Sequence, residues 1–333
     1  MRVMITGANS FVGRALVQRL LADGALRGKR IEILRLLDDQ LRGFPEDQRL
    51  RFHIGSIANA ALLRRSIADG IDVVFHLGSI LDGTAEEEYA LGYQLNLLAS
   101  LELLNQLREQ SVAPVIVYAS SVAVYGDNLP ARMDECAAPR PALSGGSHNL
   151  VVETALEDLA RRGDLDGRAV RLPGIVTLSR ESNGWRSAFM SELIRAFVDG
   201  EPYSCPVSAA ANCWWMSVRC CVTNLVHAAE LDSSVLIGRR VWQLPLLKLR
   251  IDQLIDALAA TFGQERRNLI SFAPDARLEA LHGNFPTMRT PQARALGFCH
   301  DGSAASLIRH TLNPVPGVNA RKAKRGDTPH ETD

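Results

Sequence analysis

The sequence has no excess of either charge, few aromatic residues and no long apolar run. Lys+Arg and Asp+Glu both number 37 among 333 residues, so a formal net charge of zero gives no global electrostatic case for nucleic-acid or membrane partners. No uncharged run reaches the about 18 residues of a transmembrane helix. The N-terminus enters a strand at once, without the cleavage site of a signal peptide. We therefore expect a cytoplasmic protein.

The six cysteines show no Cys-x-x-Cys pair, so we interpret them as reduced, mostly buried thiols. A metal site from Cys205, Cys213 and Cys220 would have the spacing of no common zinc site, and no metal is expected. The remaining cysteines are Cys136, Cys221 and Cys299.

Short apolar stretches alternate with segments of helical periodicity over about the first 170 residues. This alternation predicts an α/β fold with a doubly wound parallel (Rossmann) sheet. The expected strands are 3–6, 31–37, 51–54, 72–77, 114–119 and 168–172. The expected helices are 10–21, 59–68, 87–109 and 150–162.

After Pro173 the periodic pattern loosens, which predicts a smaller C-terminal lobe at 174–315, interleaved with the sheet of the first domain at 1–173. Residues 178–188 read as a loop over a site, and 316–333 as a disordered tail. Further strands are expected at 213–218 and 241–244. Further helices are expected at 189–198, 222–230, 251–262 and 275–281. Trp214 and Trp215 are expected to pack in the lobe rather than to form a substrate cage.

The turn between the first strand and the first helix reads Gly7-Ala8-Asn9-Ser10-Phe11-Val12-Gly13. Gly7 would permit a tight turn and Gly13 close packing of the helix. Ser10, Phe11 and Val12 begin the helix, whose N-terminus favours a pyrophosphate. The Ser10 hydroxyl could either donate to a phosphate or crowd it. The pattern predicts a dinucleotide site.

Polar and small residues follow the next strands at the same edge of the sheet. Asp38 ends the second strand, where a carboxylate accepts from ribose hydroxyls and repels a 2′-phosphate, so NAD is favoured over NADP. Ser56 and Ile57 follow the third strand, near the expected adenine. Leu77, Gly78 and Ser79 follow the fourth, where the nicotinamide ribose would pass.

The segment Ala119-Ser120-Ser121-Val122-Ala123-Val124-Tyr125-Gly126 resembles that of the extended short-chain dehydrogenase/reductase (NAD-dependent epimerase/dehydratase) family. Within this family, the D-erythronate dehydrogenase group is the one that three further stretches resemble. These are residues 75–80, 171–176 and 224–229, and Pro173 lies in the second. The resemblance implies NAD-dependent oxidation of a small hydroxy acid. It also implies that Asn96 props the active-site helix, and that helices 87–109 and 150–162 pair in a homodimer.

In that family a Tyr-x-x-x-Lys pair removes the hydroxyl proton, and this chain has Gly145 and Asn149 at the two positions. Ser121 remains to orient the substrate, and Asn149 could still bond a ribose hydroxyl without supplying charge. In the substrate loop only Asn183 matches the subgroup.

Three residues are considered as a replacement acid or base: His148, Tyr118 and Tyr125. His148 lies one helical step, about 100°, from the face that the Lys would use. Two functions stay open: a dehydrogenase, slowed by the missing pair, or a catalytically inactive NAD-binding module that acts as a sensor.

Overall fold

The computed structural model describes residues 1–80, 82–179, 188–236 and 238–314. Within this part of the chain no helix has the length and apolarity needed to cross a bilayer. The predicted tail at 316–333 and most of the predicted loop at 178–188 lie outside the described residues.

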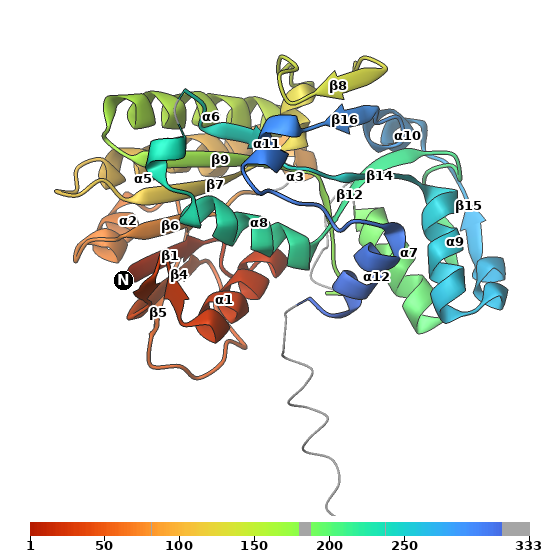
Figure 1. Cartoon of the computed structure of the whole chain (residues 1–333), viewed down its shortest axis with the longest axis horizontal. Helices are drawn as coiled ribbons and strands as arrows, with labels where there is room; N and C mark the ends of the chain where they lie inside the picture. The colour runs from red at the N-terminus through yellow and green to blue at the C-terminus, as the bar shows by residue number, and fades with distance from the viewer. Residues whose placement is uncertain (81, 180–187, 237, 315–333) are drawn as a thin grey trace, which may run out of the picture.

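A seven-stranded parallel sheet forms the centre of the molecule, which confirms the predicted fold class (Figure 1). After β1 the chain adds β4 and β5 on one side, then crosses to add β6, β7, β9 and β13 on the other. This reversal beside β1 opens a crevice at the carboxyl ends of the strands. The strands are β1 (Arg2–Thr6), β4 (Ile33–Asp38), β5 (Leu50–Ile54), β6 (Val73–His76), β7 (Val115–Ser121), β9 (Asp166–Leu172) and β13 (Val241–Gln243).

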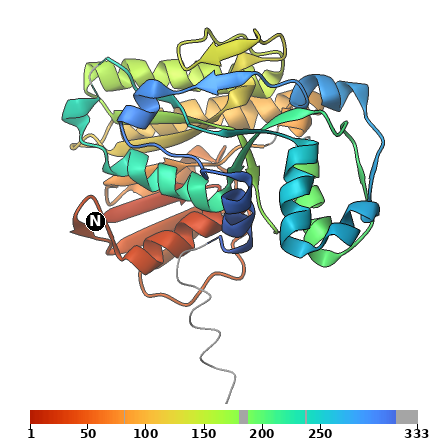
Figure 2. The ribbon, with the colours of Figure 1, turned by 45° about the vertical axis from the view of Figure 1, so that its right-hand side comes forward.

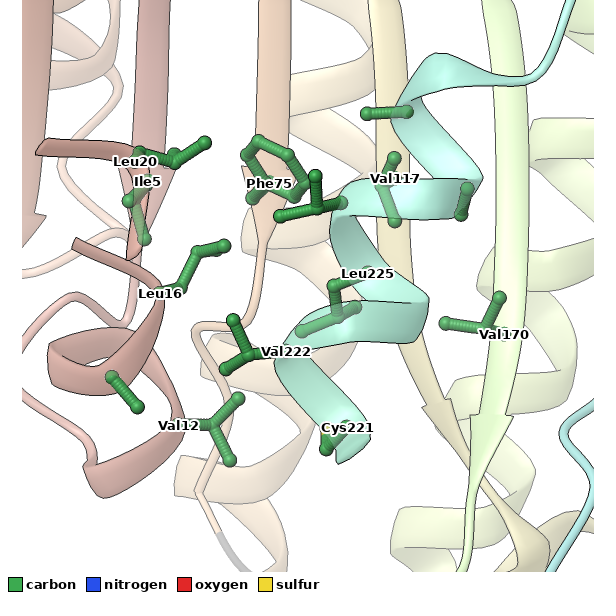
Figure 3. Packing of buried hydrophobic residues seen from close by; sticks show 14 of the residues in the cluster. Ile5, Val12, Leu16, Leu20, Phe75, Val117, Val170, Cys221, Val222 and Leu225 are labelled. Carbon is green, nitrogen blue, oxygen red and sulfur yellow. The ribbon is translucent and has the colours of Figure 1, made fainter. Parts of the chain in front are cut away.

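Helices cover both faces of the sheet because successive strand residues point to opposite sides. Val3 and Ile5 of β1 pack in one apolar cluster, and Met4 between them packs in another. α1 and α8 lie on the first face, where Figure 3 shows Leu16 and Leu225 meeting the strands. α2, α5 and α6 lie on the second. The helices are α1 (Phe11–Asp23), α2 (Ala60–Ile67), α5 (Ala99–Leu107), α6 (Ser144–Arg162) and α8 (Val218–Glu230).

The single helix predicted at 87–109 is instead a series of segments. Glu88 leaves helical geometry, with φ −113° and ψ 66°, and a π-helical turn follows. Periodicity alone cannot show such interruptions, because the apolar spacing continues across them. The segments are α3 (Asp82–Glu87), α4 (Tyr89–Gly92), the π-helix η1 (Tyr93–Leu98) and α5.

Helix α6 begins at Ser144, well before residue 150, where it was predicted to start. Its glycines obscure this beginning, since Gly is a poor helix former. Gly146 is required there, because a Cβ at that position would overlap the Ala123 carbonyl. Gly145 and Asn149 therefore both lie inside α6, at i and i+4 on one face.

The C-terminal lobe packs around its own apolar cluster beside the sheet (Figure 2). Its core elements are β10 (Gly174–Val176), β12 (Asn212–Ser217), β14 (Leu247–Arg250), α7 (Ala188–Asp199), α9 (Ile251–Phe262) and α12 (Ala304–Leu312). Helix α9 has the predicted bounds. Sequence reasoning missed α12 and several short elements. Two are strand pairs whose members are distant in the chain: β8 (Arg132–Asp134) with β16 (Thr287–Arg289), and β11 (Tyr203–Cys205) with β15 (Ile270–Phe272). The others are the short hairpin of β2 (Ala25–Leu26) with β3 (Lys29–Arg30), and the helix α11 (Pro291–Ala295).

Candidate active site

A cavity of about 660 Å³ lies at the carboxyl ends of the sheet strands and is closed on one side by the lobe. This volume lies in the range of cofactor and ligand pockets. Ser121 lines it, and so do thirteen of the fourteen residues predicted to bind the cofactor. These are Gly7, Ser10, Phe11, Val12, Asp38, Ser56, Ile57, Leu77, Gly78, Ser79, Asn96, Asn149 and Pro173.

The two glycines of the first turn have the roles that the sequence predicts. Gly7 has a φ of +67°, and a Cβ there would lie 2.7 Å from the Gly78 nitrogen. Gly13 lies behind the cavity wall, where a Cβ would overlap the Gly7 carbonyl. Because glycine has no Cβ, α1 can pack against the turn. Both positions keep the backbone next to the cavity free of side chains, as close approach of a pyrophosphate requires.

Ser10 uses its hydroxyl to cap α1, a role that sequence reasoning did not consider. The oxygen accepts from the Gly13 N–H at 3.1 Å and donates to the Gly7 carbonyl at 2.8 Å. The hydroxyl thus stabilises the helix start and the turn together. The positive end of the α1 dipole faces the cavity, where it favours an anion.

Asp38 lies at the end of β4 with its carboxylate fixed by the backbone. Its oxygens accept from the Asn9 N–H at 2.9 Å and the Asp39 N–H at 2.8 Å. Burial raises the pKa of Asp38, and the two N–H donors partly offset this rise. Asp39 also lines the cavity, so two carboxylates oppose a phosphate at this end.

A buried polar chain holds the loop after β6. The Asn96 amide accepts from the Ile80 N–H at 2.8 Å and donates to the Ile80 carbonyl at 2.9 Å. Ser100 bonds the Asn96 carbonyl and His76, and His76 bonds Thr6. Burial lowers the pKa of His76 to about 4, so its imidazole is neutral. The Asn96 side chain thus supports the Ile80 loop, not the active-site helix that the resemblance implied.

The side chains at the end of β7 and on α6 form the wall opposite the glycine turn. Ser121 accepts from the Ala123 N–H at 3.1 Å, which leaves its own proton able to donate. Asn149 accepts from the Tyr118 hydroxyl at 2.6 Å through Oδ1. Gly145 is buried and is not among the residues that line the cavity.

None of the three proposed replacements reaches the cavity lining within the described residues. The Tyr118 hydroxyl is directed at Asn149. Tyr125 is buried beneath the loop, where its hydroxyl accepts from Arg171 at 2.9 Å and burial raises its pKa. His148 packs against two tyrosines of α4 and η1, and burial lowers its pKa. The geometry therefore argues against all three.

A buried ion pair between Glu153 and Arg171 lies behind the cavity wall. Ser120, which lines the cavity, donates to Glu153 at 2.5 Å. The Arg171 guanidinium donates to both Glu153 oxygens, at 2.9 and 2.7 Å. Burial alone would lower the pKa of Arg171, but the contacts with Glu153 outweigh it and raise the pKa. The pair fixes α6 to β9 directly behind Ser120.

The lobe supplies a wall that sequence reasoning largely missed. Trp214 stacks on Phe285 with ring centroids 4.3 Å apart, and both line the cavity with Met190 and His282. Trp215 lies in the lobe core, and Trp214 is buried in a smaller apolar cluster beside the cavity, so both tryptophans pack as predicted. No motif marks His282, which ends the helix α10 (Ala276–His282). The predicted substrate residue Asn183 lies outside the described residues.

Few of the described lining residues can exchange a proton. The titratable side chains among them are Asp38, Asp39 and His282, with no Lys or Arg. Serine hydroxyls and an amide complete the polar set near Ser121. This lining can orient a hydroxyl group, but it lacks the phenol–ammonium pair that would remove the proton efficiently.

Comparison with known proteins agrees with this architecture. Residues 3–237 match the family model "NAD dependent epimerase/dehydratase family". A D-erythronate dehydrogenase of Cupriavidus necator is 36% identical over 93% of this chain and 97% of its own length. One from Haemophilus influenzae is 30% identical over 94% of this chain and 99% of its own.

A solved structure described as the nucleoside-diphosphate-sugar epimerase from Agrobacterium tumefaciens has a TM-score of 0.87. It is 29% identical, and the match covers 94% of each chain. An L-threonine dehydrogenase from Cupriavidus necator shares the fold, with a TM-score of 0.83 at 19% identity over 94% of this chain and 99% of its own. Together with the glycine turn and the sheet order, these matches show that the chain belongs to the NAD-dependent epimerase/dehydratase family.

Proposed function

We propose that this protein is an NAD-dependent oxidoreductase that oxidises a small hydroxy acid or a sugar-derived alcohol, slowly because the Tyr–Lys pair is absent. One observation carries the proposal: a single cavity joins the glycine turn and Asp38 to Ser121 and the lobe wall. NAD, when bound, accepts a hydride from the alcohol carbon. The backbone at Gly7 and the start of α1 would hold its pyrophosphate, and Asp38 its adenosine ribose.

Asn149 would bond the second ribose through its amide. Because Tyr118 donates to Oδ1, the amide nitrogen is left as the donor toward the cavity. This hydrogen bond would position the ribose, but an uncharged amide cannot lower the pKa of a neighbouring acid as a Lys does. Ser121 would donate to the substrate oxygen and orient the carbon that loses the hydride.

Activity tests the proposal directly. NADH formation should be measurable with a panel of four- to six-carbon hydroxy acids and the matching neutral polyols. Ser121→Ala should lower it about tenfold or more, because the substrate oxygen loses its donor. Turnover no higher than in the Ser121→Ala control would count against the enzyme.

His282 is the one histidine among the described lining residues, and histidine is the side chain that most often accepts protons in catalysis near neutral pH. His282→Gln distinguishes a proton acceptor from a wall residue. An acceptor role predicts loss of turnover with NAD affinity unchanged, whereas a wall role predicts mainly a changed KM.

Asp38→Ala should weaken NAD binding about 10- to 100-fold, because hydrogen bonds to a charged group contribute roughly 1.5–3 kcal/mol. Calorimetric titration measures this change. The exposed neighbour Asp39 provides the matched control, and Asp39→Ala should change affinity far less. Equal losses in the two variants would contradict the assignment of Asp38.

A second candidate is a catalytically inactive NAD-binding sensor. It is favoured by the joint loss at Gly145 and Asn149, with none of the three replacements at the described cavity lining. Calorimetric titration with NAD and NADH, read beside the activity assay, separates the two. Tight binding without turnover supports the sensor, and no binding below millimolar concentration refutes both.

We also propose a homodimer through α4, η1 and α6. Five of the ten exposed large apolar side chains of the described chain lie on these segments: Tyr89, Leu91, Tyr93, Leu98 and Val151. Light scattering at micromolar concentration should give a dimer, and Leu98→Glu with Val151→Glu should give monomers. Val235→Glu, at an exposed apolar position on another segment, is the control. A monomeric natural chain would refute the proposal.

A further inference from the structure

Two cysteines distant in sequence lie in contact on the face of the molecule formed by α8. The Sγ atoms of Cys220 and Cys299 are 4.0 Å apart. Cys220 is buried in the first turn of α8, and Cys299 is exposed in the irregular segment before α12. Of the six cysteines, four are buried and only Cys136 and Cys299 are exposed. Cys299 is thus an accessible thiol with a second thiol beside it.

Hydrogen bonds of two side chains hold the segment around Cys299 against α8. The Asn224 amide, one turn after Cys220, accepts from the Cys299 N–H at 3.0 Å and donates to the Cys299 carbonyl at 2.9 Å. On the other side, Asp301 accepts from the Ser217 N–H and hydroxyl at 2.8 and 2.5 Å. Cys299 is therefore fixed against the start of α8 rather than on a free loop.

Asp301 is the charged group that acts on the Cys299 thiol. The contact between the two thiols lowers the pKa of Cys299 to about 7, although burial and the Asp301 carboxylate oppose the fall. Asp301 is itself paired with His310 of α12 at 2.7 Å. An accessible thiol of low pKa beside a second thiol is the arrangement of oxidation-sensitive cysteines.

We propose that Cys299 is a site of reversible oxidation by peroxides, with Cys220 as the cysteine that resolves it to a disulfide. The Cys299 thiolate attacks one peroxide oxygen, the O–O bond breaks, and the departing hydroxide takes up the proton that the thiol released, so the products are a sulfenic acid and water. The Cys220 sulfur then attacks the Cys299 sulfur, and its proton leaves with the hydroxyl as a second water. Two thiols and one hydrogen peroxide thus give one disulfide and two waters.

The sulfur atoms must approach by roughly 2 Å to reach disulfide bonding distance. Because Cys299 lies outside regular secondary structure, this movement requires its hydrogen bonds to Asn224 to lengthen but does not require α8 to unwind. The disulfide would fasten the segment before α12 to α8. This inference is independent of the proposed dehydrogenase activity.

The test treats the full chain with equimolar hydrogen peroxide near neutral pH, blocks free thiols and maps the peptides by mass. The expected product is a Cys220–Cys299 cross-link with a mass loss of about 2 Da, for two hydrogens, reversed by dithiothreitol. Cys220→Ala should stop at a sulfenic acid on Cys299, trapped by dimedone. Cys221→Ala, at the fully buried neighbour, should form the disulfide as the natural chain does.

The pH dependence of Cys299 alkylation provides a second readout. Thiolate is present above the pKa, so the rate should rise with a midpoint near pH 7 in the natural chain. In Cys220→Ala the midpoint should move to higher pH, because the stabilising donor is gone. Oxidation of Cys136 with Cys299 left reduced, no cross-link, or an unchanged midpoint would each overturn the proposal.

Discussion

Gly145→Tyr combined with Asn149→Lys should raise the rate of substrate oxidation about 10²–10⁴-fold, the usual contribution of a positioned acid/base. The two positions lie on one face of α6, so a phenol and an ammonium placed there would be adjacent. The ammonium would lower the phenol pKa toward neutral pH and bond the ribose. Steady-state NADH formation measures the gain.

The single variants are the controls for this rescue. Gly145→Tyr alone leaves a phenol with a pKa near about 10, which is little base at neutral pH. Asn149→Lys alone has no phenol to tune. Since Tyr118 now donates to Asn149, the double variant should also be made with Tyr118→Phe to remove a hydroxyl that could hold the new Lys.

The activity of the double variant shows whether only the Tyr–Lys pair has been lost or whether the substrate pocket has changed as well. A double variant that folds and binds NAD but oxidises none of the panel would show that the substrate pocket has changed too. The segment at 178–183, which differs from the subgroup pattern, would then be the next region to exchange. That result would also favour the sensor over the enzyme.

Arg171→Met should lower the free energy of unfolding by about 3–5 kcal/mol, because it leaves the Glu153 carboxylate buried without its partner. The Arg171 side chain is 8% exposed and that of Glu153 is 2% exposed. Whole domains are stable by only about 5–15 kcal/mol, so the loss is a large share. Urea unfolding followed by circular dichroism measures it.

Two comparisons test the explanation. Glu153→Leu with Arg171→Met removes both charges and should recover much of the loss, since an apolar pair leaves no charge buried. Arg161→Met breaks the exposed pair with Asp158, where the side chains are 73% and 56% exposed, and should cost no more than about 1 kcal/mol. Equal small losses for Arg171→Met and Arg161→Met would show that Glu153 is solvated after all.

Local sequence patterns predicted those parts of the site that are formed by one continuous segment of the chain. The turn from Gly7 to Gly13 and the strand end at Asp38 depend on backbone geometry and neighbours a few residues away, so their residue types reveal them. The alternation of strands and helices likewise predicted the sheet. The break at Glu88 and the early start of α6 were missed, because packing rather than propensity decides them.

The sequence by itself determined the dinucleotide-type turn, the sheet and the absence of the Tyr–Lys pair, since each is written in adjacent or regularly spaced residues. Only the tertiary structure decided which other side chains surround the cavity. Trp214 and His282 reach it from a distant lobe, whereas His148, one residue from Asn149, points away from it. The contact between Cys220 and Cys299 likewise joins α8 to a distant segment. Such tertiary contacts depend on how helices and strands pack against one another, and the spacing of residues in the sequence does not encode them.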